Sequence, residues 1–225
     1  MKYLGLETST RACSVAVSDE ATLLAEMTVA GQDRPSDQMM PAVQQVLAAA
    51  GLVLADLDGV AVSAGPGSFT GIRVGVTAAK TLAYTLGKPV TAVSSLDVLA
   101  ANVPAPRWPL WVLVDARKEK LYAARYEISE NEWPSRAGEE QLVALDQLLP
   151  QLTGEVVILG DGLVRYGAAI QQALGARCHP LPPALWVPRA SAVCRLAAQY
   201  PVPAPDVHAL APHYLFSKES DITGW

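Results

Sequence analysis

Residues 63–81 read SAGPGSFTGIRVGVTAAKT, a glycine-rich loop that leads from an apolar segment into a stretch of small residues. The preceding run at 59–63, GVAVS, is short and apolar, as expected for a buried strand. After the loop, residues 72–86 are predicted to form a helix, which Gly87 closes and Pro89 stops. A strand, a tight glycine loop and a helix in this order indicate an α/β fold.

The glycine loop fits neither common phosphate-binding pattern. A Walker loop needs Gly, four residues and then Gly-Lys-Ser/Thr, and here no lysine follows Gly71. A dinucleotide fingerprint would continue Gly65 and Gly67 with a third glycine, and Thr70 stands at that position. The loop amides can still face an anion at the start of the helix. Two interpretations of this segment therefore remain: it binds a phosphate group, or it forms a surface for another protein.

Small residues recur at every fourth position along the predicted helix, at Gly71, Gly75, Ala79 and Ala83, and so lie on one ridge. A glycine inside a helix costs roughly 1 kcal/mol relative to alanine, and the expected return is the close approach of another helix. That helix belongs either to the same domain or to a partner protein.

Composition excludes several classes of protein. The chain has 225 residues, of which 51% are hydrophobic and 17% charged, so it has one large or two small domains with proper cores. The net charge of −5, without a dense run of lysine or arginine, argues against independent binding of nucleic acid. Three cysteines cannot form a closed disulfide framework and favour a reducing compartment. We find no signal-peptide pattern and no apolar run of about 20 residues, so we expect a cytoplasmic protein without membrane association.

The first part of the chain reads as three strands, a helix, a strand, a helix and a strand. The three opening strands follow one another closely and predict an antiparallel meander. A short helix after Ser94 completes this unit. The predicted elements lie at 3–8, 13–17, 22–29, 39–51, 59–63, 72–86, 89–93 and 94–103.

The segment 104–109, PAPRWP, is the best domain boundary because its prolines resist regular structure. We therefore predict an N-terminal lobe at 1–103 and a C-terminal lobe at 104–225, whose last helix or tail can pack back on the first lobe. The second lobe again begins with strands, which suggests a duplicated α/β architecture. Its predicted elements lie at 110–114, 121–128, 146–152, 156–159, 163–174 and 190–200.

Hydrolytic and metal chemistry find little support. Ser68 is not at a nucleophile elbow, because Thr70 stands where the second glycine is needed. The histidines His179, His208 and His213 lack a paired spacing such as HxxxH, so we predict surface histidines and no metal site.

Two positions combine a strand with a carboxylate. Glu7 on the first strand can hold a metal–phosphate group or cap the turn at Ser9 and Thr10. Asp115 and Arg117 follow a buried strand and can position a ligand or pair with each other. Glu7, Asp115 and Arg117 are therefore candidates for a cleft, with a structural role as the simpler alternative in each case.

Three segments resemble the TsaB (YeaZ) family: LGLETSTRACSVAV at 4–17, SAGPGSFTGIRVGVTAAKTLA at 63–83 and VDARKEKLYAARYE at 114–127. The resemblance implies a two-lobed fold of the actin, sugar-kinase and Hsp70 type, each lobe a mixed sheet flanked by helices. It further implies a non-catalytic partner of TsaD, in a complex with the ATPase TsaE that forms threonylcarbamoyladenosine beside the anticodon of certain tRNAs. Such chains associate through helices of the first lobe, with TsaD or as a homodimer.

The departures from the pattern of TsaD agree with a non-catalytic role. Arg11 and Ala12 stand where TsaD-like chains carry Asp-Glu, and the stretch 34–39 has no HxxxH motif, with Pro35 in the place of a histidine. No intrinsic cofactor is therefore expected: ATP and metal would be handled by the partner subunits, and tRNA would be met only through the complex. Phe216 replaces an arginine of the family's Pro-x-Tyr-Leu-Arg segment.

The resemblance places the partner interface on the two helices of the first lobe, although periodicity does not decide which side of the 39–50 helix faces outward. It predicts that a bulky charged residue at Ala79 blocks association with TsaD and leaves the fold intact. A small-molecule kinase and a peptidase of the same fold remain the alternatives. The predicted interface residues are Met39, Met40, Val43, Leu47, Gly71, Arg73, Gly75, Val76, Ala79, Lys80 and Ala83.

Overall fold

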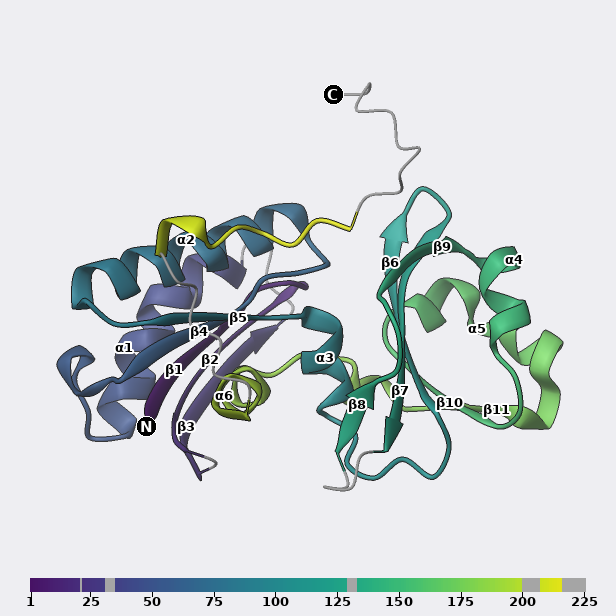
Figure 1. Ribbon diagram of the computed structural model, residues 1–225, viewed down its shortest axis with the longest axis horizontal. Helices are drawn as coiled ribbons and strands as arrows, with labels where there is room; N and C mark the ends of the chain where they lie inside the picture. Colours follow the sequence, from purple (N-terminus) through teal and green to yellow (C-terminus); the bar gives the residue numbers. More distant parts are fainter. Residues whose placement is uncertain (21, 31–34, 129–132, 200–206, 216–225) are drawn as a thin grey trace. The chain divides into compact units, whose positions relative to one another are not determined.

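The computed structural model describes residues 1–20, 22–30, 35–128, 133–199 and 207–215, which form two compact units (Figure 1). The first unit comprises Met1–Asn102 and Val187–His213, and the second comprises Val103–Trp186 and begins again at Tyr214. The chain thus leaves the first unit just before the proline-rich segment and later returns to it. Residues 187–213 of the predicted C-terminal lobe, 104–225, thus belong to the first unit, as the prediction allowed for the last helix.

The strands of the first unit form one sheet in the order β3-β2-β1-β4-β5. β1 runs antiparallel to β2 and parallel to β4, with Leu4 opposite Val17 on one side and Val60 on the other. The predicted meander of the first three strands is confirmed. The strands are β1 (Lys2–Glu7), β2 (Ala12–Asp19), β3 (Thr22–Ala30), β4 (Gly59–Ser63) and β5 (Val90–Val93).

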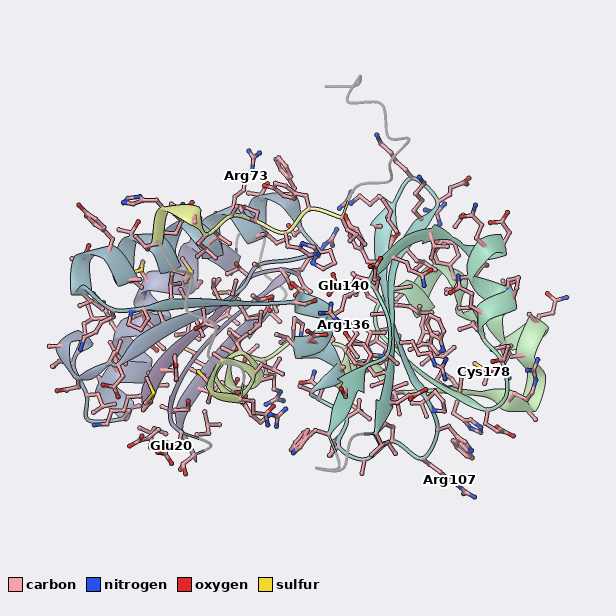
Figure 2. The ribbon with its side chains drawn as sticks, in the orientation of Figure 1. Glu20, Arg73, Arg107, Arg136, Glu140 and Cys178 are labelled. Carbon is pink, nitrogen blue, oxygen red and sulfur yellow. The ribbon has the colours of Figure 1, made fainter. Side chains whose placement is uncertain are left out.

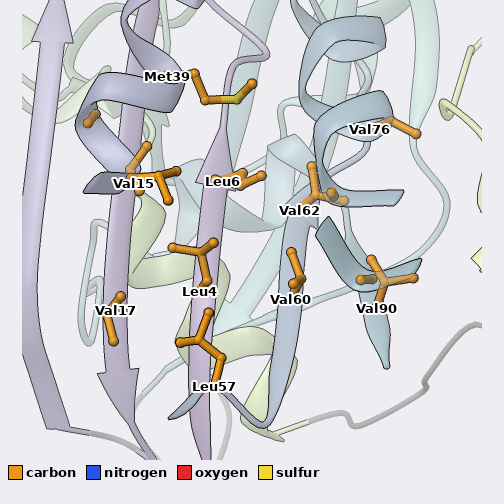
Figure 3. Packing of buried hydrophobic residues seen from close by; sticks show 14 of the residues in the cluster. Leu4, Leu6, Val15, Val17, Met39, Leu57, Val60, Val62, Val76 and Val90 are labelled. Carbon is orange, nitrogen blue, oxygen red and sulfur yellow. The ribbon is translucent and has the colours of Figure 1, made fainter. Parts of the chain in front are cut away.

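Helices cover both faces of this sheet (Figure 1). The first two, α1 and α2, pack on the face to which Leu4 and Leu6 point, and Figure 3 shows this apolar layer. The last, α6, packs on the opposite face, where Gly5 leaves room for the backbone of Ala190. This apolar contact is why α6 belongs to the first unit. The helices of the first unit are α1 (Met39–Ala49), α2 (Phe69–Leu86), α3 (Ser95–Ala100) and α6 (Ala190–Gln199).

The second unit repeats the strand order of the first, because β8-β7-β6-β10-β11 matches β3-β2-β1-β4-β5 in order and in direction. The predicted duplication is confirmed. A further strand, β9, pairs with β7, and α4 and α5 pack against this sheet. The elements are β6 (Leu110–Arg117), β7 (Lys120–Ile128), β8 (Pro134–Arg136), β9 (Gln141–Ala144), α4 (Leu145–Leu148), β10 (Val156–Leu159), α5 (Gly162–Leu174) and β11 (Cys178–Pro180).

Short 3₁₀ helices connect these elements: η1 (Pro35–Gln38), η2 (Leu54–Asp56), η3 (Leu149–Gln151), η4 (Gly175–Arg177), η5 (Pro183–Leu185) and η6 (Val207–Ala209). Among the described helices, none combines the length and the hydrophobicity that a membrane span needs. Arg34, Phe216 and the tail after it, on which parts of the sequence interpretation rest, lie outside the described residues.

Candidate protein-binding site

The glycine loop before α2 packs tightly against the end of β1. A Cβ at Gly67 would collide with the carbonyl oxygen of Ser9, and a Cβ at Gly71 with that of Thr8. The amide of Ser68 donates to the Ser9 carbonyl over 2.7 Å, and the Ser68 side chain caps α2 by accepting from the Gly71 amide. Glycine is therefore required here for backbone contact within the unit.

These contacts argue against a phosphate cradle, because loop amides that would face an anion already donate within the protein. Gly65 has a φ of +112° and lies beside the carbonyl of His213, so a second segment closes the loop from another side. Thr70 is exposed on the first turn of α2. The loop is a tight entry to a helix.

The ridge of small residues faces the sheet of its own unit. A Cβ at Gly75 would meet Thr8 Oγ1 and, at 3.5 Å, the side chain of Val62 on β4. Ala79 is fully buried, and Ala83 is 1% exposed. The close neighbour of the ridge is thus a strand of the same domain, which is ordinary packing. The assignment of Gly75, Ala79 and Ala83 to a partner interface is wrong, as is that of Val76, which is 3% exposed.

Helix α1 also turns most of the predicted contact residues inward. Met39, Val43 and Leu47 are buried in the core between helices and sheet, and Figure 3 shows Met39 above Leu6. Their assignment to a partner interface is wrong for the same reason. Met40 is 44% exposed, so it stays available for a partner.

The side of α1 and α2 that points away from the sheet is exposed and nearly uncharged. α1 has no charged residue, and α2 has only Arg73 and Lys80, although 17% of the whole chain is charged. The exposed fractions of Phe69 and Tyr84 are 38% and 69%. We call this surface the outer face. Its residues are Met40, Gln44, Gln45, Ala48, Phe69, Thr70, Arg73, Thr77, Thr81 and Tyr84.

Arg73 supplies the charge of the outer face, and Figure 2 shows its side chain pointing away from α2. Its guanidinium carbon lies 3.8 Å from the centroid of the Phe69 ring, a cation–π contact that fixes both side chains. Lys80, by contrast, is used within the unit: its Nζ donates to the carbonyls of His208 and Leu210, over 3.0 and 2.9 Å. The Lys80 ammonium group is therefore already engaged within the unit, which argues against its predicted role as a direct partner contact.

Glu7 is completely buried at the end of β1, so it does not line an accessible cleft. Its Oε1 accepts the amide of Ser9 over 2.5 Å, which is the predicted turn cap. Burial raises the pKa of the Glu7 carboxyl above its usual value of 4.5, while hydrogen bonds from Ser63 and Ser9 act in the opposite direction. Burial thus favours the protonated form of this carboxyl more than water would.

Asp115 serves the turn between β6 and β7. Its Oδ1 accepts the backbone amide of Arg117 over 2.9 Å, and its own amide donates to Asp161 Oδ1 over 3.0 Å. Asp115 thus has a structural role, as the simpler alternative predicted, and it pairs with the backbone of Arg117. Arg117 itself is exposed on the turn.

Within the described residues, no three His, Cys, Asp or Glu side chains come together to hold a metal ion. His179 bonds Glu155 over 2.6 Å and stacks on Trp108 at 4.1 Å between ring centroids. His208 contacts the ring of Tyr84, and the amide of His213 donates to the Ala64 carbonyl. These histidines have structural neighbours in their own units.

The cysteines are buried and free. Burial raises the pKa of the Cys13 thiol to about 11, with the nearby Glu7 adding to the effect, and that of Cys194 to about 12. Because thiolates are the reactive form, we expect a thiol reagent such as Ellman's to modify the native protein at pH 8 at least about tenfold more slowly than the urea-unfolded chain. Rapid native labelling of either residue would contradict the packing described here.

Comparison with known proteins gives the family. Residues 30–210 match the family described as TsaD, tRNA N6-adenosine threonylcarbamoyltransferase. A curated protein from Bacillus subtilis (strain 168), named tRNA threonylcarbamoyladenosine biosynthesis protein TsaB, is 32% identical over 98% of this chain and 96% of its own length. This chain belongs to the TsaB family. A TsaB of the same description from Escherichia coli (strain K12) is 34% identical over 72% of each chain.

Solved structures agree with the TsaB (YeaZ) assignment. A structure described as YeaZ from Pseudomonas aeruginosa has a TM-score of 0.76 and 29% identity, over 95% of this chain and 99% of that chain. Another from that organism, described as an uncharacterized protein with similarity to peptidase YEAZ, has a TM-score of 0.79 and 27% identity, over 96% and 99% of the two chains. The predicted family and the predicted fold class are confirmed.

The sequence analysis does not identify four exposed residues of the outer face: Phe69, Thr77, Thr81 and Tyr84. A signal was present, because these side chains lie opposite the small-residue ridge on a helix of 3.6 residues per turn. A ridge that faced a partner would turn these side chains toward the sheet, whereas a ridge on the sheet exposes them. Because the ridge of small residues packs on the sheet, the residues on the opposite side of α2 form the exposed outer face.

Proposed function

We propose that this TsaB-family chain is the non-catalytic subunit that binds and activates a TsaD-type partner in the formation of threonylcarbamoyladenosine in tRNA. The observation that carries the proposal is the outer face of α1 and α2. Exposed apolar and uncharged polar side chains with a single exposed charge, Arg73, agree with the core of a protein interface, from which charged residues are depleted. The names of the relatives support a role in threonylcarbamoyladenosine biosynthesis. We include a TsaE-type protein as the third member of the proposed complex.

The first unit offers little for catalysis of its own, which supports a role through a partner. Arg11 is exposed where a TsaD-like chain has a carboxylate, and the buried Glu7 carboxyl is engaged with the Ser9 amide. A positive charge at position 11 does not hold a metal–phosphate group. ATP and metal are therefore assigned to the partner subunits, and tRNA is met only in the assembled complex.

The test is tRNA modification in vitro by TsaD- and TsaE-type partners, with and without this chain. We expect product formation to require it. Product formation at the same rate in its absence overturns the proposal, as does turnover of Mg-ATP by the isolated chain, since this would indicate a kinase.

The outer face is tested by Thr77→Glu, which places a carboxylate in the middle of the exposed side of α2. We expect TsaD-type partner affinity to fall at least tenfold, because a charge in an apolar contact must be desolvated. Thr153→Glu changes an exposed threonine of the second unit in the same way and serves as the matched control. Equal affinity of the two variants contradicts this location of the interface.

A further inference from the structure

A C-terminal segment, residues 207–213, runs along the side of α2, and we call it the strap (Figure 1, yellow). Its apolar side chains, Val207 and Leu210, join the core of the first unit, and Leu210 is 6% exposed. Its far end is tied to the glycine loop, where the His213 amide donates to the Ala64 carbonyl over 2.7 Å. The strap is therefore an integral part of this side of the molecule.

Lys80 is the polar anchor of the strap. Its ammonium donates to two strap carbonyls, those of His208 and Leu210, across a sequence separation of about 130 residues. Hydrogen bonds from a charged donor are stronger than those between neutral groups. A lysine on α2 thus fixes the backbone on either side of residue 209.

The anchored part of the strap borders the outer face. The ring of His208 lies 5.6 Å from that of Tyr84, centroid to centroid, and both side chains are exposed. Tyr84 shares one side of α2 with Thr77 and Thr81, because residues three, four and seven positions apart lie above one another. A partner that covers these threonines as far as Tyr84 would also meet His208.

We propose that the strap is part of the surface that receives the TsaD-type partner, with Lys80 as its positioning residue. This inference rests on the proposed function and adds a contact surface outside the two helices. A strap that is fixed before association saves the entropy cost of ordering it in the complex. Lys80 then acts through His208 and does not touch the partner itself.

The first experiment replaces the anchor by Lys80→Met, which keeps the apolar stem and removes the ammonium. In the isolated chain we expect amide hydrogen exchange of residues 208–211 to become at least tenfold faster. Affinity for the TsaD-type partner, measured by titration calorimetry, is expected to fall about tenfold. Lys88→Met removes the same charge just beyond the end of α2 and should change neither quantity. Weaker binding without faster exchange would make Lys80 a direct contact and overturn the proposal.

The second experiment is a double-mutant cycle with His208→Ala. If Lys80 acts through the strap, His208→Ala alone weakens binding, and Lys80→Met adds less in its presence than in the wild type. Full additivity, or unchanged affinity of His208→Ala, overturns the role of the strap. Thr77→Glu separates the two proposals: if it abolishes binding while both strap variants bind normally, the outer face stands and the strap inference alone fails.

Discussion

Ala79→Glu is expected to unfold the first unit. Ala79 is fully buried in the contact between α2 and the sheet, where no space and no water are available for a carboxylate. Burying an unpaired charge and forcing a longer side chain into a packed core are both among the few changes that cost more than about 4 kcal/mol. This is comparable with the total stability of many domains, about 5–15 kcal/mol. Circular dichroism and thermal unfolding measure the effect.

Thr77→Glu is the matched control for this prediction, because it places the same side chain two residues away on the exposed side of α2. An exposed substitution of this kind changes stability by no more than about 0.5 kcal/mol. We therefore expect a folded variant at position 77 and an unfolded or aggregated one at position 79. Cooperative unfolding of Ala79→Glu near the wild-type temperature would mean that the ridge does not face the sheet.

The contrast between these two positions shows what the sequence predicts well and what it leaves open. The existence and the C-terminal end of α2 follow from local signals, since Gly87 adopts a φ of +63° after its last turn. Its start at Phe69, capped by Ser68, lies three residues before the predicted start at position 72. The direction in which its ridge points is a tertiary property. A ridge of small residues can pack closely against a strand as well as against a helix. The sequence around Gly75 does not indicate that Thr8 is its neighbour in the fold.

The same distinction explains the rest of the molecule. Apolar strands such as β1, β6 and even the short β10 are predictable from their composition, whereas β8, β9 and β11 are short and lack a continuous apolar run. The anchor of Lys80 on the strap joins residues about 130 positions apart, so local sequence gives no sign of it. Family resemblance suggested the helices of the proposed interface, but the structure is needed to select the exposed residues on them.

Glu7→Gln is expected to change how stability depends on pH. In the folded chain, burial raises the pKa of the Glu7 carboxyl above the usual value of 4.5. Below that value, folded and unfolded chains both carry the proton. Above it, the unfolded chain releases a proton that the folded chain retains, so the free energy of unfolding falls as pH rises until the folded-state pKa is passed. Glutamine keeps the shape and the acceptor for the Ser9 amide but does not titrate.

Stability of the Glu7→Gln variant relative to the wild type should therefore grow from pH 5 to pH 8, as measured by urea unfolding at both values. Glu139→Gln, at an exposed position of the second unit, makes the same chemical change and should give no such trend. A difference between Glu7→Gln and wild type that is the same at both pH values would mean that Glu7 is ionised in the folded core. The charge would then have to be balanced by hydrogen bonds from Ser9, which follows β1, and from Ser63, which ends β4.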